Sequence, residues 1–233
     1  MSALLWGLVA ASSLTLGAVL AIVRTWSDGV VGAVLAFGAG ALISSVSFEL
    51  AEEGVSLGGA WPVAIGLALG ALAFFGGDRG VERWGGRSRS GGAGIALAVG
   101  ALLDGIPEQA VLGIGLGGGH GISAALLVAI FVSNLPESVG SSADMLGGGR
   151  SRRSVLLLWL AVSVVCALAT GAGYLVSGVA SVELRGAING FAAGALLTML
   201  IDAMAPEARE KAKDYAGLCT VVGFASAAAL SLL

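Results

Sequence analysis

The sequence predicts an all-α integral membrane protein with eight transmembrane helices, and three observations support this prediction. First, 57% of the 233 residues are hydrophobic, only 12% are charged and the mean hydropathy is +0.95, unlike the composition of soluble domains. Second, the apolar residues form runs of about 20, long enough to cross roughly 30 Å of hydrocarbon as a helix. Third, these runs are continuous, whereas strands of a membrane β-barrel alternate polar and apolar residues.

Eight apolar runs fill most of the chain. We expect the spans at about 3–23, 30–51, 62–77, 93–117, 121–146, 154–178, 185–206 and 213–233. Many of the 39 glycines stand four residues apart, such as Gly66 and Gly70 in the third run and Gly113 and Gly117 in the fourth. Such small residues allow helices to approach closely in lipid. The chain is therefore expected to form one transmembrane domain, residues 1–233.

The basic residues predict how these spans are oriented, because Lys and Arg concentrate in cytoplasmic loops. All but one of the 12 basic residues lie near the ends of spans one, three, five and seven: Arg24, Arg79, Arg83, Arg87, Arg89, Arg150, Arg152, Arg153, Arg209, Lys211 and Lys213. Only Arg185 falls on the other side. An eight-span bundle with both termini outside satisfies this distribution, and we expect a multi-pass protein of the cell membrane.

Two segments of the chain resemble each other at an offset of 154 residues. Residues 37–53 ("FGAGALISSVSFELAEE") and 191–207 ("FAAGALLTMLIDAMAPE") are identical at seven of 17 positions. The offset pairs span two with span seven and span three with span eight, which run in opposite directions. Inverted repeats of this kind are common in transporters. We therefore expect a 3+2+3 bundle, with repeats at about 3–77 and 154–233 and a central helix pair at about 93–146.

The two central spans carry related polar motifs, "DGIPEQ" and "SNLPES", in otherwise apolar surroundings. Asp104 and Glu108 are four residues apart in the first motif. In the second, Ser133 and Asn134 precede Glu137 by four and three residues. These spacings place each set on one face of a helix. If the two faces meet, they form a cluster of oxygen ligands near the middle of the membrane.

The acids of these motifs have no basic partner within any span. A charged side chain at the bilayer centre costs roughly 2.5–3.5 kcal/mol on insertion scales. A bound cation would offset this cost, and the motifs therefore predict a cation site. Two other interpretations stay open at this point: the acids are protonated, or the prolines are ordinary kinks and the acids are hydrogen-bonded between helices.

With these motifs the chain resembles the ZIP (Zrt/Irt-like) family of divalent metal transporters, whose fourth and fifth spans carry HNxPEG- and HExPHE-like motifs. Both Pro-Glu pairs match. Asp104 takes the place of the first His, and Ser133 and Asn134 take the places of the His and the acid in span five. In span seven, Asp202 takes the His place of an HExxPEA-like ending. The transport-site histidines are absent and span six has no acid, which leaves open whether the site is mononuclear or binuclear.

Two further acids extend the candidate metal ligands along a path through the membrane. Glu49 is expected near the outer end of span two, and Asp202 in the inner part of span seven. The complete candidate set is Asp104, Glu108, Ser133, Asn134, Glu137, Asp202 and Glu49. Its oxygen ligands suit harder ions such as Mn²⁺, Mg²⁺ or Ca²⁺, although carboxylates also bind Zn²⁺.

The sequence and the resemblance together predict a transporter of divalent metal cations (Zn/Mn/Fe-like) that moves them inward, with the metal as substrate, no cofactor and no enzymatic activity. Two alternatives remain: a non-transporting cation-binding or sensor protein, and a proton-coupled carrier of another solute. The expected partners are divalent metal ions and the lipid bilayer, and a homodimer is left open. A net charge of −3 and arginines explained by topology exclude nucleic acid.

Overall fold

The computed structural model describes residues 2–85, 92–117 and 124–231, and within these ranges it leaves some side chains undescribed, including those of 81–101. The described residues are almost entirely helical and none of them forms a strand. The α-helices are α1 (Ser2–Val23), α2 (Asp28–Ser45), α3 (Glu53–Gly58), α4 (Ala60–Gly85), α5 (Gly92–Gly117), α6 (Ala124–Gly147), α7 (Arg152–Val179), α8 (Val182–Met199), α9 (Ala205–Ala212) and α10 (Ala216–Ser231). The predicted all-α fold is confirmed.

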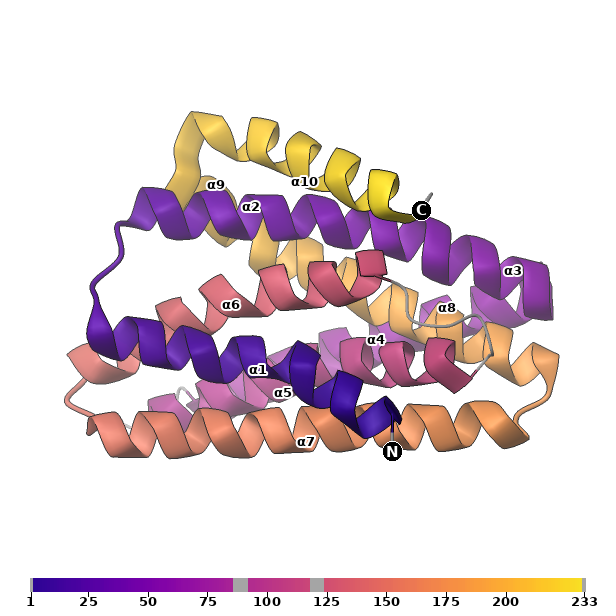
Figure 1. Ribbon diagram of the computed structural model, residues 1–233, viewed down its shortest axis with the longest axis horizontal. Helices are drawn as coiled ribbons and strands as arrows, with labels where there is room; N and C mark the ends of the chain where they lie inside the picture. Colours follow the sequence, from indigo (N-terminus) through magenta and orange to yellow (C-terminus); the bar gives the residue numbers. More distant parts are fainter. Residues whose placement is uncertain (1, 86–91, 118–123, 232–233) are drawn as a thin grey trace.

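Two long rods contain π-helical segments. The first rod continues from α2 through η1 (Val46–Glu52) into α3, and the second from α8 through η2 (Leu200–Met204) into α9. A short 3₁₀ segment, η3 (Lys213–Tyr215), then leads to α10. Lys213 has a positive φ of 53°, and α10 runs back along the bundle from this turn (Figure 1).

Six helical segments of the described residues are long and apolar enough to cross a membrane, and the protein is therefore a multi-pass membrane protein. The last of these segments, Val182–Ser231, contains 50 residues and includes the turn before α10. The α1–α2, α6–α7 and α9–α10 connections lie at one end of the bundle, on the left in Figure 1. We call it the basic end, because Arg24, Arg150 and Lys213 are in these connections.

Helix ends follow from local sequence. Ser151 accepts a hydrogen bond from the backbone N–H of Ser154 (3.2 Å) at the start of α7. Ser181 does the same for Leu184 (3.3 Å) at the start of α8. Both satisfy N–H groups that a helix leaves unpaired in its first turn. Between α3 and α4, Gly59 has a φ of +84°, a conformation that a residue without a Cβ adopts easily.

Glycines allow two pairs of helices to pack in the same way. Helix α2 packs along α10, and α4 packs along α8. A Cβ at Gly40 of α2 would overlap the carbonyl oxygen of Thr220 on α10, and a Cβ at Gly194 of α8 would overlap that of Leu67 on α4. Gly40 and Gly194 are 154 residues apart, the offset of the sequence repeat, and the facing residues are 153 apart. The same backbone contact is thus made twice.

The π-helical segments follow the same offset. Segment η1 begins at Val46 and segment η2 at Leu200, again 154 residues apart. Fewer than about 1% of residues in globular proteins are π-helical. Two such segments at equivalent positions therefore support a structural repeat that relates the α2 rod to the α8 rod.

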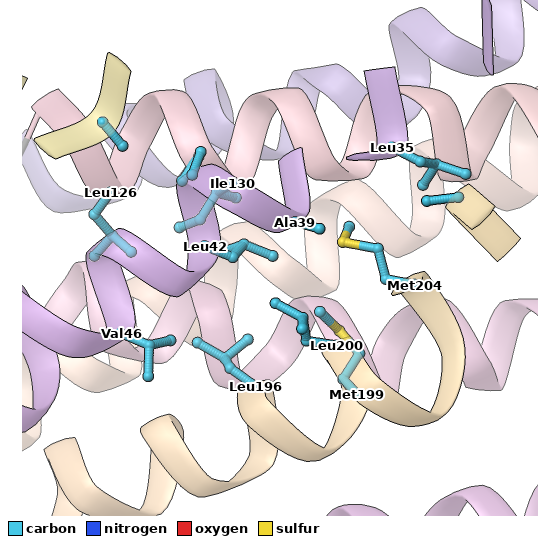
Figure 2. Packing of buried hydrophobic residues seen from close by; sticks show 14 of the residues in the cluster. Leu35, Ala39, Leu42, Val46, Leu126, Ile130, Leu196, Met199, Leu200 and Met204 are labelled. Carbon is cyan, nitrogen blue, oxygen red and sulfur yellow. The ribbon is translucent and has the colours of Figure 1, made fainter. Parts of the chain in front are cut away.

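The largest apolar core lies where α2, α6 and α8 meet. Figure 2 shows its side chains pointing toward one another from these three elements and from the adjoining π-helical segments. The labelled members are Leu35, Ala39, Leu42, Val46, Leu126, Ile130, Leu196, Met199, Leu200 and Met204. Each is at most 5% exposed. This packing holds α6, one of the two motif helices, between the two long rods.

Candidate metal site between α5 and α6

The first motif glutamate is in the interior of the protein. Helix α5 continues through Pro107, and Glu108 directly after it is 1% exposed. Asn134 of α6 is 2% exposed. Helices α5 and α6 therefore each bury a polar side chain from one of the two motifs.

These two side chains and Glu137 belong to one polar cluster. Asn134 lies close enough to Glu108 for a polar contact, and Glu137 is near enough for its charge to act on the Glu108 carboxylate. Among the described atoms, however, neither carboxylate oxygen of Glu108 nor the amide nitrogen of Asn134 completes a hydrogen bond of standard geometry. The contact is thus a close approach and not a formed hydrogen bond. A buried carboxylate in this condition requires a cation or a proton.

Two members of the candidate set cannot be placed in this cluster. The side chains of Asp104 and Ser133 lie outside the described residues, although their backbones belong to α5 and α6. Among the side chains that are described, no three Asp, Glu, His or Cys residues gather closely enough to hold a metal ion. The described part of the cluster consists of two carboxylates and one amide.

The residue after each Pro-Glu pair connects its helix to a neighbour. The Thr170 hydroxyl on α7 donates to Gln109 Oε1 (2.6 Å) in the interior. The Ser138 hydroxyl on α6 lies 3.5 Å from the Ser13 carbonyl oxygen on α1 and donates to Leu135 at 2.9 Å. Neither contact was predicted from the sequence. Their common position after Pro-Glu was the signal that could have pointed to them.

Close backbone packing further fixes α5. A Cβ at Gly113 of α5 would overlap the carbonyl oxygen of Thr170, and a Cβ at Gly173 of α7 would overlap that of Ala110. Helix α5 is therefore packed closely against α7 next to the Gln109 hydrogen bond. This close contact with α7 helps to hold α5, the helix that carries Glu108, in place.

The two outer acids of the candidate set lie in the π-helical segments. Glu49 is in η1 and half-buried, and Asp202 is in η2 and exposed. The Glu49 side chain is not isolated, because it interacts with neighbouring residues. π-helical segments often occur at functional sites, because the extra residue changes the direction of the side chains. The structure does not bring Asp202 into the buried cluster, since its side chain is on the surface.

An ion pair lies beside α6 toward the basic end. Lys211 Nζ is 2.6 Å from Glu207 Oε1, with 24% and 40% of the respective side chains exposed. A Cβ at Gly140 of α6 would come within 3.3 Å of Lys211 Nζ. Gly140 follows Glu137 by three residues, about one helical turn. The ammonium group is therefore located next to the helix that carries the cluster, on the side of the basic end.

The chain matches no model of a known protein family, and it matches no curated protein at a significant level. Its function therefore has to be inferred from the site itself.

Proposed function

We propose that the protein transports divalent metal cations of the Zn/Mn/Fe type inward across the cell membrane, through a site between α5 and α6. One observation carries this proposal: Glu108 is buried, its two oxygens have no hydrogen-bond partner among the described residues, and Asn134 and Glu137 lie near it. A divalent cation would compensate two carboxylates, and the Asn134 amide oxygen offers a further ligand. Oxygen ligands of this kind bind hard divalent cations.

The proposed transporter has eight crossings arranged as 3+2+3, with both termini outside. In this arrangement α1, the α2–α3 rod and α4 form one repeat, α5 and α6 form the central pair, and α7, the α8–α9 rod and α10 form the second repeat. The equivalent π-helical segments and the duplicated glycine contacts support it. The resemblance to ZIP transporters is part of the proposal, as are Asp104 and Ser133 as further ligands.

Transport would follow from relative movement of the repeats around the fixed central pair. The cation loses its water as it enters the cluster, where carboxylate and amide oxygens replace part of its hydration shell. No basic side chain belongs to the described part of the cluster, so a bound cation would supply the positive charge that offsets the buried Glu108 carboxylate. Glu49 and Asp202, on the two long rods, are proposed as ligands on the way in and on the way out.

Metal uptake into vesicles tests this function. Purified full-length protein in liposomes loaded with a metal-sensitive dye is expected to admit Mn²⁺ and Zn²⁺ faster than protein-free liposomes, and a pH-sensitive dye measures proton flux in parallel. Metal binding without uptake would favour the sensor alternative. Proton flux that does not depend on added metal would favour a proton-coupled carrier of another solute. Either result contradicts metal transport.

The ion pair beside α6 yields a second prediction. If Lys211 and Glu207 must separate before the cation leaves toward the basic end, Lys211→Met is expected to raise the initial uptake rate. The increase should stay below about fivefold, because a partly exposed ion pair is worth at most about 1 kcal/mol. Initial rates of Mn²⁺ uptake measure the effect.

Arg209→Met is the matched control for this variant. Arg209 is on the same helix and also pairs with an acid, Asp214, at 3.5 Å, but both side chains are exposed. Its loss should leave the uptake rate unchanged. Equal effects of the two variants, or a slower rate with Lys211→Met, would show that the Lys211–Glu207 pair is no barrier to release.

A further inference from the structure

A surface hollow opens at the basic end, away from the buried cluster. Its volume is about 790 Å³, and it is lined by the end of α1, the start of the α1–α2 connection and the α6–α7 connection. The polar residues of its lining are Arg24, Thr25, Arg150, Ser151 and Arg152. No acidic side chain is among the described residues that line it. The hollow therefore combines three guanidinium groups with two hydroxyl groups.

The backbone of the α6–α7 connection is fixed by a Schellman motif. The N–H of Arg150 donates to the carbonyl of Met145, and the N–H of Gly149 donates to that of Leu146, both at 3.0 Å. Gly149 has the positive φ, +87°, that this helix ending requires. Ser151 then caps α7. Arg150 and Arg152 thus flank a structured turn, and their positions at the hollow do not depend on an irregular loop.

The hollow lies at the end of the apolar helix α1, where lipid headgroups are expected. Arg24 directly follows the apolar helix α1, and its guanidinium carbon lies 5.2 Å from the ring centre of Trp26. Tryptophan is enriched at the boundary between hydrocarbon and water. The lining combines apolar residues such as Ile22 and Leu146 with the arginines, so that it offers contacts to an acyl chain as well as to an anion.

We propose that this hollow binds a phosphate group, carried at this depth by the headgroup of an anionic phospholipid. Guanidinium groups bind phosphate oxygens in a two-point geometry, with charge-assisted hydrogen bonds. The first turn of α7 adds backbone N–H groups and the positive end of the helix dipole. Basic pockets between transmembrane helices are known to hold anionic headgroups. The site is independent of the metal site, and the proposal stands without the transport function.

Binding to the purified full-length protein in a non-ionic detergent tests the proposal, with the shift in melting temperature as the measure. The probes are dioctanoyl phosphatidylglycerol, dioctanoyl phosphatidylcholine and inorganic phosphate at constant ionic strength. Phosphatidylglycerol is expected to stabilise the protein, and phosphatidylcholine much less. If inorganic phosphate also raises the melting temperature, free phosphate is a sufficient ligand. If only phosphatidylglycerol raises it, the ligand is the lipid headgroup. No response to either anion would overturn the proposal.

Variants separate this site from the general positive charge of the basic end. The double variant Arg24→Gln with Arg152→Gln should weaken phosphatidylglycerol binding by about 25-fold, which is about fivefold for each arginine. Replacing both by Lys should retain only part of the binding, because the charge remains but the two-point contact with the phosphate oxygens is lost. Arg153→Gln is the control, since Arg153 is adjacent on α7 but does not line the hollow. If Arg153→Gln weakened phosphatidylglycerol binding as much as Arg152→Gln, the binding would depend on surface charge alone. That result would contradict a defined site.

Discussion

Replacing Glu108 with glutamine is expected to abolish metal uptake while the protein still inserts and folds. Glutamine has nearly the same shape, so the packing of the buried side chain is preserved, but one of the two described carboxylates is lost. Removing one partner of a buried charged pair costs about 3 kcal/mol or more, which corresponds to a loss of roughly a hundredfold or more in uptake. Initial rates of Mn²⁺ uptake in vesicles with matched protein content measure this loss.

Glu137→Gln is expected to have an effect of similar size, because Glu137 lies on α6 near enough for its charge to act on Glu108. Glu183→Gln is the control, since Glu183 is exposed in the first turn of α8. The thermal stability of the Glu108→Gln variant shows whether Glu108 acts as a metal ligand or stabilises the fold. Without metal, Glu108→Gln should be at least as stable as the unmodified protein, because an uncompensated buried charge has been removed. Near-normal uptake, or a large loss of metal-free stability, would contradict the role of Glu108 as a ligand.

The helices could be predicted from the sequence because membrane spans depend on the length and continuity of apolar runs. Their ends were less predictable. The third span was expected at 62–77, whereas α4 extends from Ala60 to Gly85. Hydropathy locates the part of a helix that lies in hydrocarbon, but charged residues such as Asp78 and Arg79 continue the same helix beyond it. The α4 start, in contrast, follows from the positive φ of Gly59.

The central cluster was predictable only in part. Spacing within one helix placed Asn134 and Glu137 on one face, since that depends on helix geometry alone. Gln109 was not singled out, because its partner Thr170 is 61 residues away and only the packing of α5 on α7 brings them together. The exposure of Asp202 depends on packing in the same way. A sequence motif identifies a side chain and its helix face, but not the neighbour that the face meets.

The duplicated glycine contacts lead to the second prediction with a large effect. Gly40→Ala and Gly194→Ala are each expected to destabilise the protein, by similar amounts. A Cβ at either position would overlap a backbone carbonyl oxygen of the facing helix, Thr220 on α10 or Leu67 on α4. A carbonyl group cannot move aside as the end of a flexible side chain can. The helices therefore have to separate, which costs about 1–3 kcal/mol in a well-packed interior.

Gly76→Ala supplies the control for these two variants. Gly76 is exposed on α4, and a Cβ there would meet no atom within 4 Å. Its replacement should leave the stability unchanged or raise it by up to about 1 kcal/mol, because alanine favours helix more than glycine does.

Unfolding in detergent by a denaturant, followed by the loss of helical circular dichroism, measures all three variants. The comparison between Gly40→Ala and Gly194→Ala is the informative one, because the two glycines occupy equivalent places only if the α2–α10 and α8–α4 pairs are repeats of one unit. Helices in lipid associate through close packing, because no hydrophobic driving force acts between them there. If the two pairs are repeats, each substitution should therefore weaken this packing to the same extent. A large loss at one position with tolerance at the other would show that the pairs differ energetically, and the proposed inverted repeat would lose its main support.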